Sequence, residues 1–243
     1  MKKQEVFLSF SGGLDSTTLL CWCLHENLQV HPVFFNYGSK HGPFEFAAAE
    51  AVLQAVLPHT PLTVIHLNRT GIFDGNGSAL LAANSGKEIP EGTYNTAGSL
   101  DATVVPGRNF IMASILASMA EAHVRRQEPN PVVDEAMPAP LVALGVHAGD
   151  HALYPDCRPE FVDALDKAIQ LSSDGTVSVY APFVFKTKAE IVRLAMEINA
   201  PLELTRSCYK QQAVACGKCG TCQERLAAFA ANGLVDPISY AAI

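Results

Sequence analysis

The sequence predicts an α/β fold with a doubly wound, mainly parallel sheet, followed by a helical C-terminal segment that holds a cysteine cluster. Short apolar runs alternate with longer helical patterns over most of the chain, which is the order of βαβ units. A Ser-Gly-Gly turn joins the first apolar run to the first helical pattern, as at the ligand-binding edge of doubly wound sheets. Four of the seven cysteines fall between residues 208 and 222.

The composition is that of a globular protein with one sizeable core. The chain has 243 residues, 49% of them hydrophobic, with a mean hydropathy of +0.15 and no apolar run long enough to span a bilayer. The net charge is −7 and no block of Lys or Arg stands out, which argues against nucleic-acid and membrane partners and for a small-molecule enzyme. The start shows no signal-peptide cleavage pattern, and with seven cysteines we expect a reducing, cytoplasmic location.

Three strands and two helices are expected in the first 67 residues. The strands are short apolar runs, whereas the helices carry apolar residues at helical spacing or are rich in alanine. One run, Val30–Asn36, is apolar on both faces, which favours a central place in a parallel sheet. In chain order the five elements are Glu5–Phe10, Ser16–Glu26, Val30–Asn36, Phe44–Leu57 and Leu62–Leu67.

The later elements follow a long polar stretch. Residues 68–106 are dense in Gly, Asn, Ser and Thr; loops of that length are often active-site lids, and a short helix is expected within it at Gly77–Asn84. Residues 125–140 carry four prolines and are interpreted as an exposed insertion. Thr187 and Glu190 form a capping-box pattern. The other expected elements are helices at Asn109–Val124, Pro159–Leu171 and Thr187–Ile198, and strands at Leu141–Val146 and Val177–Tyr180.

The stretch that follows the first strand predicts a phosphate-binding loop. Glycine accepts positive φ and has no Cβ, so backbone N–H groups can gather around an anion. The next helix adds unpaired N–H groups and a positive dipole end. The lysine of a Walker loop is absent, and the competing interpretation is an ordinary turn of small residues. The residues assigned to the loop are Phe10, Ser11, Gly12, Gly13, Leu14, Asp15, Ser16, Thr17 and Thr18.

The cysteine cluster has the spacing of a metal site. It reads Cys-x7-Cys-x2-Cys-x2-Cys, and glycines lie inside the two short steps. Four thiolates suit tetrahedral zinc and leave no open position, so the site is expected to be structural. An iron–sulfur cluster is the alternative. The expected ligands are Cys208, Cys216, Cys219 and Cys222.

Further polar residues lie near expected strand ends, where doubly wound sheets bind ligands. Arg108 precedes a helix and is a candidate partner for a phosphate or carboxylate. Asp150 and Asp156 are candidates to hold Mg²⁺ or to accept hydrogen bonds from a purine-like edge, and Arg158 to pair with a carboxylate. His41 follows the second strand on the same edge. For each residue alone, a solvated loop position is the competing interpretation.

Together these motifs resemble the 7-cyano-7-deazaguanine synthase family of the PP-loop ATP pyrophosphatases. They occur in family order and span nearly the whole chain. The sequence departs from the usual pattern at Asn36, Ser39 and Lys40 and over residues 147–153, which holds His147 and His151. The matching segments are Ser11–Thr18, Tyr37-Gly38 with His41, Val105–Asn109, Tyr154–Phe161, Thr187–Ile191, and Ser207–Tyr209 with Cys216-Gly217, Cys219 and Cys222.

The resemblance implies an ATP-dependent C–N ligase of queuosine-type deazapurine biosynthesis. Such an enzyme adenylates 7-carboxy-7-deazaguanine, lets ammonia displace AMP, and adenylates the resulting amide to give the nitrile, with release of pyrophosphate. It also implies Mg²⁺ with ATP, structural Zn²⁺ and a homodimer. We divide the chain into an ATP-binding domain, residues 1–200, and a zinc-binding segment, residues 201–243. The candidate catalytic residues are Asp15, Ser16, Arg108, Asp150, Asp156, Arg158 and His41.

Three alternatives stay open at this point. One is a related ligase that stops at the amide or uses another acid. The second is a PP-loop tRNA-thiolation enzyme, although that function calls for a basic surface and this chain is acidic. The third is a nucleotide-binding module without catalytic activity, which the intact loop argues against.

Overall fold

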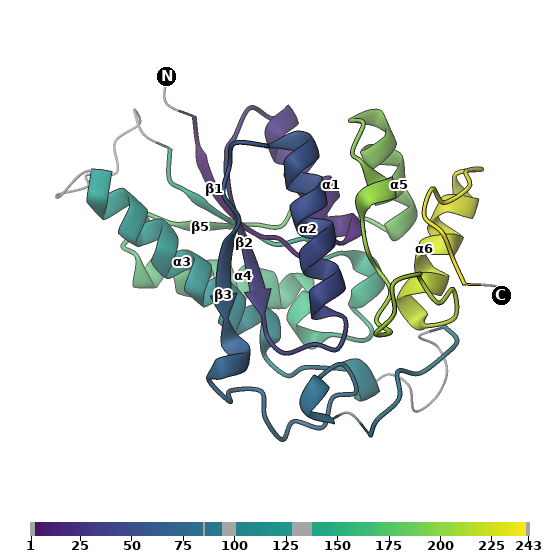
Figure 1. The fold of residues 1–243 in the computed structure, drawn as a ribbon. Helices are drawn as coiled ribbons and strands as arrows, with labels where there is room; N and C mark the ends of the chain where they lie inside the picture. The colour runs from purple at the N-terminus through teal and green to yellow at the C-terminus, as the bar shows by residue number, and fades with distance from the viewer. Residues whose placement is uncertain (1–2, 85, 94–100, 128–137, 242–243) are drawn as a thin grey trace.

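The described strands form one parallel sheet (Figure 1). The computed structural model describes residues 3–84, 86–93, 101–127 and 138–241. Within them the strand order is β3-β2-β1-β4-β5, and every neighbouring pair is parallel. This order reverses direction between β1 and β4, which is the switch point where doubly wound sheets bind ligands. The strands are β1 (Glu5–Ser9), β2 (Gln29–Asn36), β3 (Thr63–His66), β4 (Leu141–Ala143) and β5 (Ser178–Tyr180).

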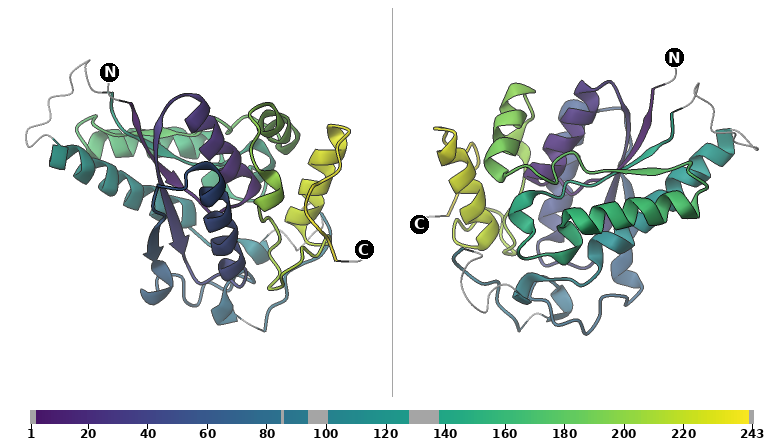
Figure 2. Two further views of the ribbon diagram at one scale, coloured as in Figure 1. Left: turned by 45° about the horizontal axis from the view of Figure 1, so that its top comes forward. Right: turned by 180° about the vertical axis from the view of Figure 1, so that it is seen from behind.

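Helices cover both faces of the sheet, as Figures 1 and 2 show from three sides. Helices α1 (Leu14–His25), α2 (Gly42–Val56) and α5 (Lys188–Glu197) pack on one face, and α3 (Arg108–Gln127) and α4 (Pro159–Ser172) on the other. Side chains of a strand alternate between the two faces of the sheet. Val6 and Leu8 therefore pack in the core under α1, α2 and α5, and Phe7 packs in the core under α3 and α4. The doubly wound prediction is confirmed.

Two expected boundaries differ from the structure. Helix α3 runs to Gln127, three residues into the expected insertion, because Glu121 and Arg125 form an i,i+4 pair, with 2.6 Å between Arg125 Nη2 and Glu121 Oε1, that supports another turn. The rest of the insertion, residues 128–137, lies outside the described residues. Strand β4 ends at Ala143 and not at residue 146; there its pairing with the short edge strand β5 ends as well.

The segment between β3 and α3 is packed rather than open where it is described. Ala79, Leu80 and Leu81 are buried in the α3-side core, and the amide of Lys40 donates to the carbonyl of Leu80 at 2.8 Å. Of the expected short helix at 77–84, only a 3₁₀ turn at Ala82–Asn84 is present. Farther along, Gly92 N donates to Lys218 O at 2.8 Å, so the segment reaches the C-terminal region (Figure 1).

The C-terminal segment is fastened to the sheet domain by helix α6 (Gly220–Ala231), which packs against α5. Arg225 of α6 is fully buried and pairs with Asp236 through two hydrogen bonds of 2.7 and 3.0 Å. The same guanidinium donates to Thr205 Oγ1 at 2.6 Å. The division of the chain at residue 200 stays a prediction. None of the helices in the described ranges is long and apolar enough to cross a membrane.

Candidate functional site

A glycine turn after β1 brings the backbone close to helix α2. Gly12 has φ +72°, and a Cβ there would lie 2.4 Å from the backbone N of Ala49. A side chain at this position would therefore collide with α2 as well as strain the backbone. The carbonyl of Gly12 accepts a hydrogen bond from Arg206 N at 3.0 Å, so the turn is also held by the C-terminal segment.

Two serine hydroxyls fix the start of helix α1. Ser11 N donates to Ser16 Oγ at 3.3 Å, and Gly13 N donates to Ser11 Oγ at 3.2 Å. Ser16 Oγ in turn donates to the carbonyl of Gly13 at 3.2 Å. This arrangement turns the N-terminus of α1 toward a cavity at the switch point. Six of the nine predicted loop residues line that cavity: Phe10, Ser11, Gly13, Leu14, Asp15 and Ser16.

The other three loop residues lie behind the cavity wall. Thr17 and Thr18 are fully buried, and Thr18 Oγ1 donates to the carbonyl of Leu14 at 2.8 Å. Gly12 faces α2. Backbone N–H groups at the start of α1, rather than threonine hydroxyls, are thus the donors that this loop offers to an anion.

A charged cluster occupies one wall of the cavity. Lys188, in the first turn of α5, lies 2.5 Å from Asp15 Oδ2 and 3.0 Å from His147 Nε2. Its ammonium is also 3.6 Å from Glu224 Oε2. Burial alone would lower the pKa of Lys188. The nearby carboxylates of Asp15 and Glu224 have the larger combined effect, so the pKa of Lys188 lies above its ordinary value. Burial raises the pKa of Asp15, but Lys188 and His147 together outweigh burial and hold that pKa below its ordinary value.

His147 connects this cluster to Asp150. Gly149 N donates to His147 Nδ1 at 3.1 Å, which leaves Nε2 to face the charged cluster. That nitrogen lies 3.4 Å from Asp150 Oδ2. Burial raises the pKa of Asp150. Asp15 Oδ1 is buried and has no hydrogen-bond partner in the described part of the chain, which leaves an oxygen available to a cation.

Another part of the cavity lining carries a partly buried acid close to arginines. Glu45 of α2 lines the cavity, and burial raises its pKa to about 7, although Arg108 and Arg206 act in the other direction. Arg108 Nη1 donates to Tyr37 OH at 3.1 Å. Arg206 donates to three carbonyls of residues 210–213 at 2.7 to 3.0 Å, so it organises the C-terminal segment beside the cavity.

Three candidate catalytic residues lie outside the cavity lining. Asp156 accepts a hydrogen bond of 3.0 Å from the backbone N of Asn109 and so caps α3. Arg158 is exposed, and its Nε donates to the carbonyl of His151 at 2.9 Å. His41 is buried behind Glu45, with 3.5 Å between His41 Nε2 and Glu45 Oε2, and burial lowers its pKa to about 3. Asp15, Ser16, Arg108 and Asp150 do line the cavity.

Several cavity residues were not among the sequence candidates. Lys188 and Glu224 are 173 and 209 positions from Asp15 in the chain, and the fold brings all three together. The one available signal was the position of Lys188 in a motif that matched the family. The same is true of Ser207 and Tyr209. Polar cavity residues without an assigned role in the sequence analysis include Glu45, Lys188, Arg206, Ser207, Tyr209 and Glu224.

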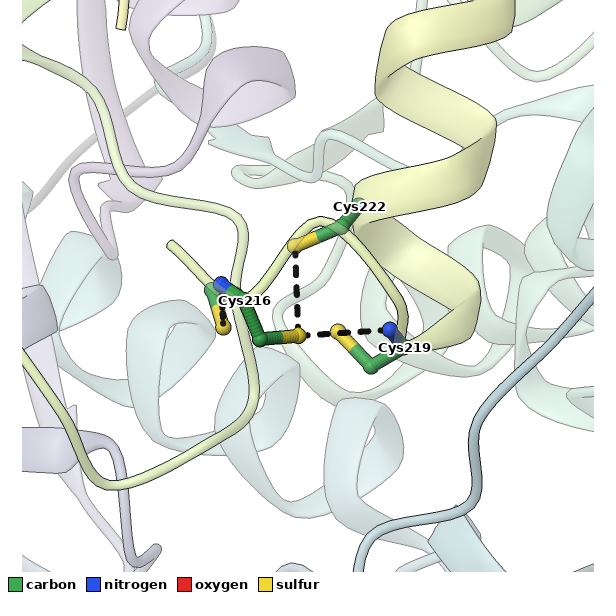
Figure 3. Close-up of side chains that lie close together, drawn as sticks. Cys216, Cys219 and Cys222 are labelled. Atoms are coloured by element: carbon green, nitrogen blue, oxygen red, sulfur yellow. Dashed lines mark hydrogen bonds between the residues drawn. The ribbon is translucent and has the colours of Figure 1, made fainter. Parts of the chain in front are cut away.

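Four cysteines beside the start of α6, Cys208, Cys216, Cys219 and Cys222, could hold a metal ion. Figure 3 shows three of them, Cys216, Cys219 and Cys222, close together. All four are buried, and their sulfur atoms lie within 4.8 Å of one another. Cys216 Sγ and Cys222 Sγ are 3.9 Å apart; a tetrahedral ion with metal–sulfur bonds of about 2.3 Å places its sulfurs about 3.8 Å apart. Cys216 N donates to Cys208 Sγ at 3.3 Å. The donor set fits a thiolate-bound metal.

The metal centre and the cavity share one stretch of chain. Ser207 and Tyr209 flank Cys208, and Thr221 and Glu224 flank Cys222; all four flanking residues line the cavity. Cys219 Sγ lies 3.3 Å from Thr221 Oγ1. A metal that holds the cysteines in place would therefore also position one side of the cavity.

Comparison with known proteins gives a relationship over the full chain. The sequence model of the family described as "Queuosine biosynthesis protein QueC" matches residues 5–233. Proteins named 7-cyano-7-deazaguanine synthase are 35% identical in Pseudoalteromonas atlantica, 36% in Marinobacter nauticus and 38% in Caldicellulosiruptor saccharolyticus. The alignments cover 98%, 97% and 95% of this chain and 99%, 97% and 92% of the relatives.

A solved structure was also found. It is the U34-tRNA thiolase NcsA from Methanococcus maripaludis with its [4Fe-4S] cluster, 13% identical, with a TM-score of 0.36 over 83% of this chain and 59% of that chain. A likeness this low carries no argument about the present site.

Proposed function

We propose that this chain, which belongs to the QueC family of queuosine biosynthesis proteins, converts 7-carboxy-7-deazaguanine and ammonia to 7-cyano-7-deazaguanine. ATP activates first the acid and then the amide, and AMP and pyrophosphate are released. The observation that carries the proposal is the full-length relationship to enzymes of that name, which covers 97% of this chain and 97% of the relative in Marinobacter nauticus. The cavity at the switch point supports it.

The start of α1 supplies the nucleotide side of the proposed site. Its N–H groups and dipole favour the phosphates of ATP, and Lys188 adds a buried cation beside them. Asp15 and Asp150 offer carboxylate oxygens for Mg²⁺, and Asp15 Oδ1 has no other hydrogen-bond partner among the described residues. Mg²⁺ bound with ATP would neutralise phosphate charge as pyrophosphate leaves.

A different part of the cavity lining would bind the substrate acid. We assign the substrate carboxylate to Arg108, because a guanidinium can bind it through two hydrogen bonds. Attack of ammonia on the acyl-adenylate forms a C–N bond, breaks the C–O bond to AMP and releases one proton. Nitrile formation breaks the second C–O bond and releases protons from the amide nitrogen. Glu45, with a pKa of about 7, is the proposed base for them.

The remaining assignments are proposals of the same kind. We propose Zn²⁺ as the ion of the cysteine centre, with a structural role, because four thiolates leave it no open position. The seven cysteines are all unpaired, which agrees with a reducing cytoplasm. The proposed homodimer is tested by light scattering of the purified protein. Asp156, Arg158 and His41 stay candidates, with positioning roles that fit their contacts.

Time-resolved mass spectrometry tests the proposed reaction. The protein is incubated with ATP, Mg²⁺, ammonium and 7-carboxy-7-deazaguanine, and the matched control is Arg108→Gln. We expect the amide to appear first and the nitrile to replace it, with little of either in the control. Amide that accumulates while ATP is in excess would support the amide-forming alternative, and no product at all would refute the proposed substrate.

A further inference from the structure

A second cluster of side chains that can bind a metal lies near the N-terminal ends of the strands, away from the cavity. Glu5 is the first residue of β1, His31 is on β2, and His123 is in the last turns of α3. Glu5 and Phe7 point to the same face of β1 because they are two residues apart, and His31 is the register partner of Phe7. Helix α3 covers that face, so it brings His123 to the pair.

The three side chains converge on one point. His31 Nε2 lies 2.6 Å from Glu5 Oε2, and His123 Nε2 lies 3.8 Å from Glu5 Oε1. All three ligand atoms lie within 4.8 Å of one another. Both imidazoles thus present the same nitrogen to one carboxylate, each to a different oxygen.

Packing holds the two rings in these orientations. The His31 ring stacks on Phe7 with 4.6 Å between centroids and an interplanar angle of 18°. The His123 ring meets Phe7 edge-on at 5.6 Å. Gln127, one turn after His123, places its side-chain amide 2.6 Å from His123 Nε2. Rotation of that amide by half a turn would offer its oxygen at the same place.

We propose that Glu5, His31 and His123 form a binding site for a divalent transition-metal ion, and we use Zn²⁺ to test it. Two imidazoles and one carboxylate suit zinc, nickel and cobalt, whereas Mg²⁺ and Ca²⁺ prefer oxygen ligands throughout. Water and the Gln127 amide oxygen would complete the coordination. Because strands rise about 3.3 Å per residue, Glu5 lies about 13 Å along β1 from the cavity-lining Ser9, so the ion ties β1, β2 and α3 together and takes no part in the chemistry.

Metal titration of untagged protein tests this site. The cysteine centre is first loaded and its content measured, and Zn²⁺ is then titrated by calorimetry. We expect one further ion to bind to the wild type, and Glu5→Gln and His123→Gln to weaken that binding at least tenfold. Glu5→Gln can keep a hydrogen bond to His31, so the strand pair is preserved. The matched control is His59→Gln, an exposed histidine, which should bind as the wild type does.

Cobalt absorption separates the two centres. Co²⁺ at the proposed site has nitrogen and oxygen ligands, so it should lack the thiolate charge-transfer band that Co²⁺ shows at the cysteines. A further ion that binds equally well to wild type and to Glu5→Gln, or that carries the thiolate band, would overturn the proposal. Saturation of the wild type at the cysteine centre alone would overturn it as well. Circular dichroism of each variant confirms that it is folded.

Discussion

The expected effect of a side chain at Gly12 is the sum of two separate costs, one for the backbone conformation and one for the contact with α2. A Cβ at Gly12 would lie 2.4 Å from Ala49 N and 2.8 Å from Ala48 C. These are backbone atoms of α2, so they cannot move aside as a flexible side chain would. For Gly12→Ala we expect a cost of about 1 kcal/mol for positive φ and a further 1–3 kcal/mol, roughly, for overpacking. The total expected loss of stability is about 2–4 kcal/mol.

Gly75→Ala is the matched control for this prediction. Gly75 has the same φ of +72° as Gly12, but nothing lies within 4 Å of the Cβ that would be added. Both substitutions share the conformational cost and the reduced entropy of the unfolded chain, so their difference isolates the contact with α2. Urea unfolding measures both free energies. Equal losses in the two variants would refute the claim that α2 forbids a side chain here.

Three further predictions follow from the buried groups and the metal centre. Asp236→Asn leaves the Arg225 guanidinium buried without its charge partner, so the free energy of unfolding should fall by about 3–5 kcal/mol; a loss below 1 kcal/mol in urea unfolding would contradict this. The pKa of Glu45 is raised from 4.5 to about 7, so the folded state binds more protons between these values and stability should fall as pH rises through that range. Activity should rise toward the same pKa as the base forms, and Glu45→Gln should remove both trends; unchanged profiles would rule Glu45 out. Chelation of the metal at the cysteines should unfold α6 and abolish AMP formation, as should Cys219→Ser, whereas Cys21→Ala, outside the centre, should retain metal; an active, metal-free protein would disprove the structural role.

The order of the elements could be predicted because each leaves a local trace. The run Val30–Asn36 is apolar on both faces and lies centrally in the sheet as β2. The capping box of α5 is present as predicted: Thr187 Oγ1 accepts from Glu190 N at 3.3 Å, and Thr187 N donates to Glu190 Oε2 at 2.8 Å. Hydrophobic periodicity and capping are properties of short segments, so one sequence suffices to read them.

The cavity could be predicted only in part because it is built from distant segments. The loop at Ser11–Ser16 has a local motif, but the partner of Asp15 is a lysine 173 residues away. Nothing near Lys188 in the chain indicates that contact. The sequence could not separate Asp150, which lines the cavity, from Asp156, which caps α3. Both follow β4, 7 and 13 residues after Ala143, and their directions depend on how the connecting segment folds.

Oxygen tracing tests the central claim most directly. In the proposed reaction, ATP activates both oxygens of the substrate carboxylate in turn, so each oxygen leaves bonded to AMP. The acid is prepared with ¹⁸O at both positions, and the nucleotide products are analysed by mass spectrometry after complete conversion. We expect two AMP per nitrile, each with one ¹⁸O, and unlabelled pyrophosphate. Unlabelled AMP, or ¹⁸O in pyrophosphate or phosphate, would contradict the proposed reaction.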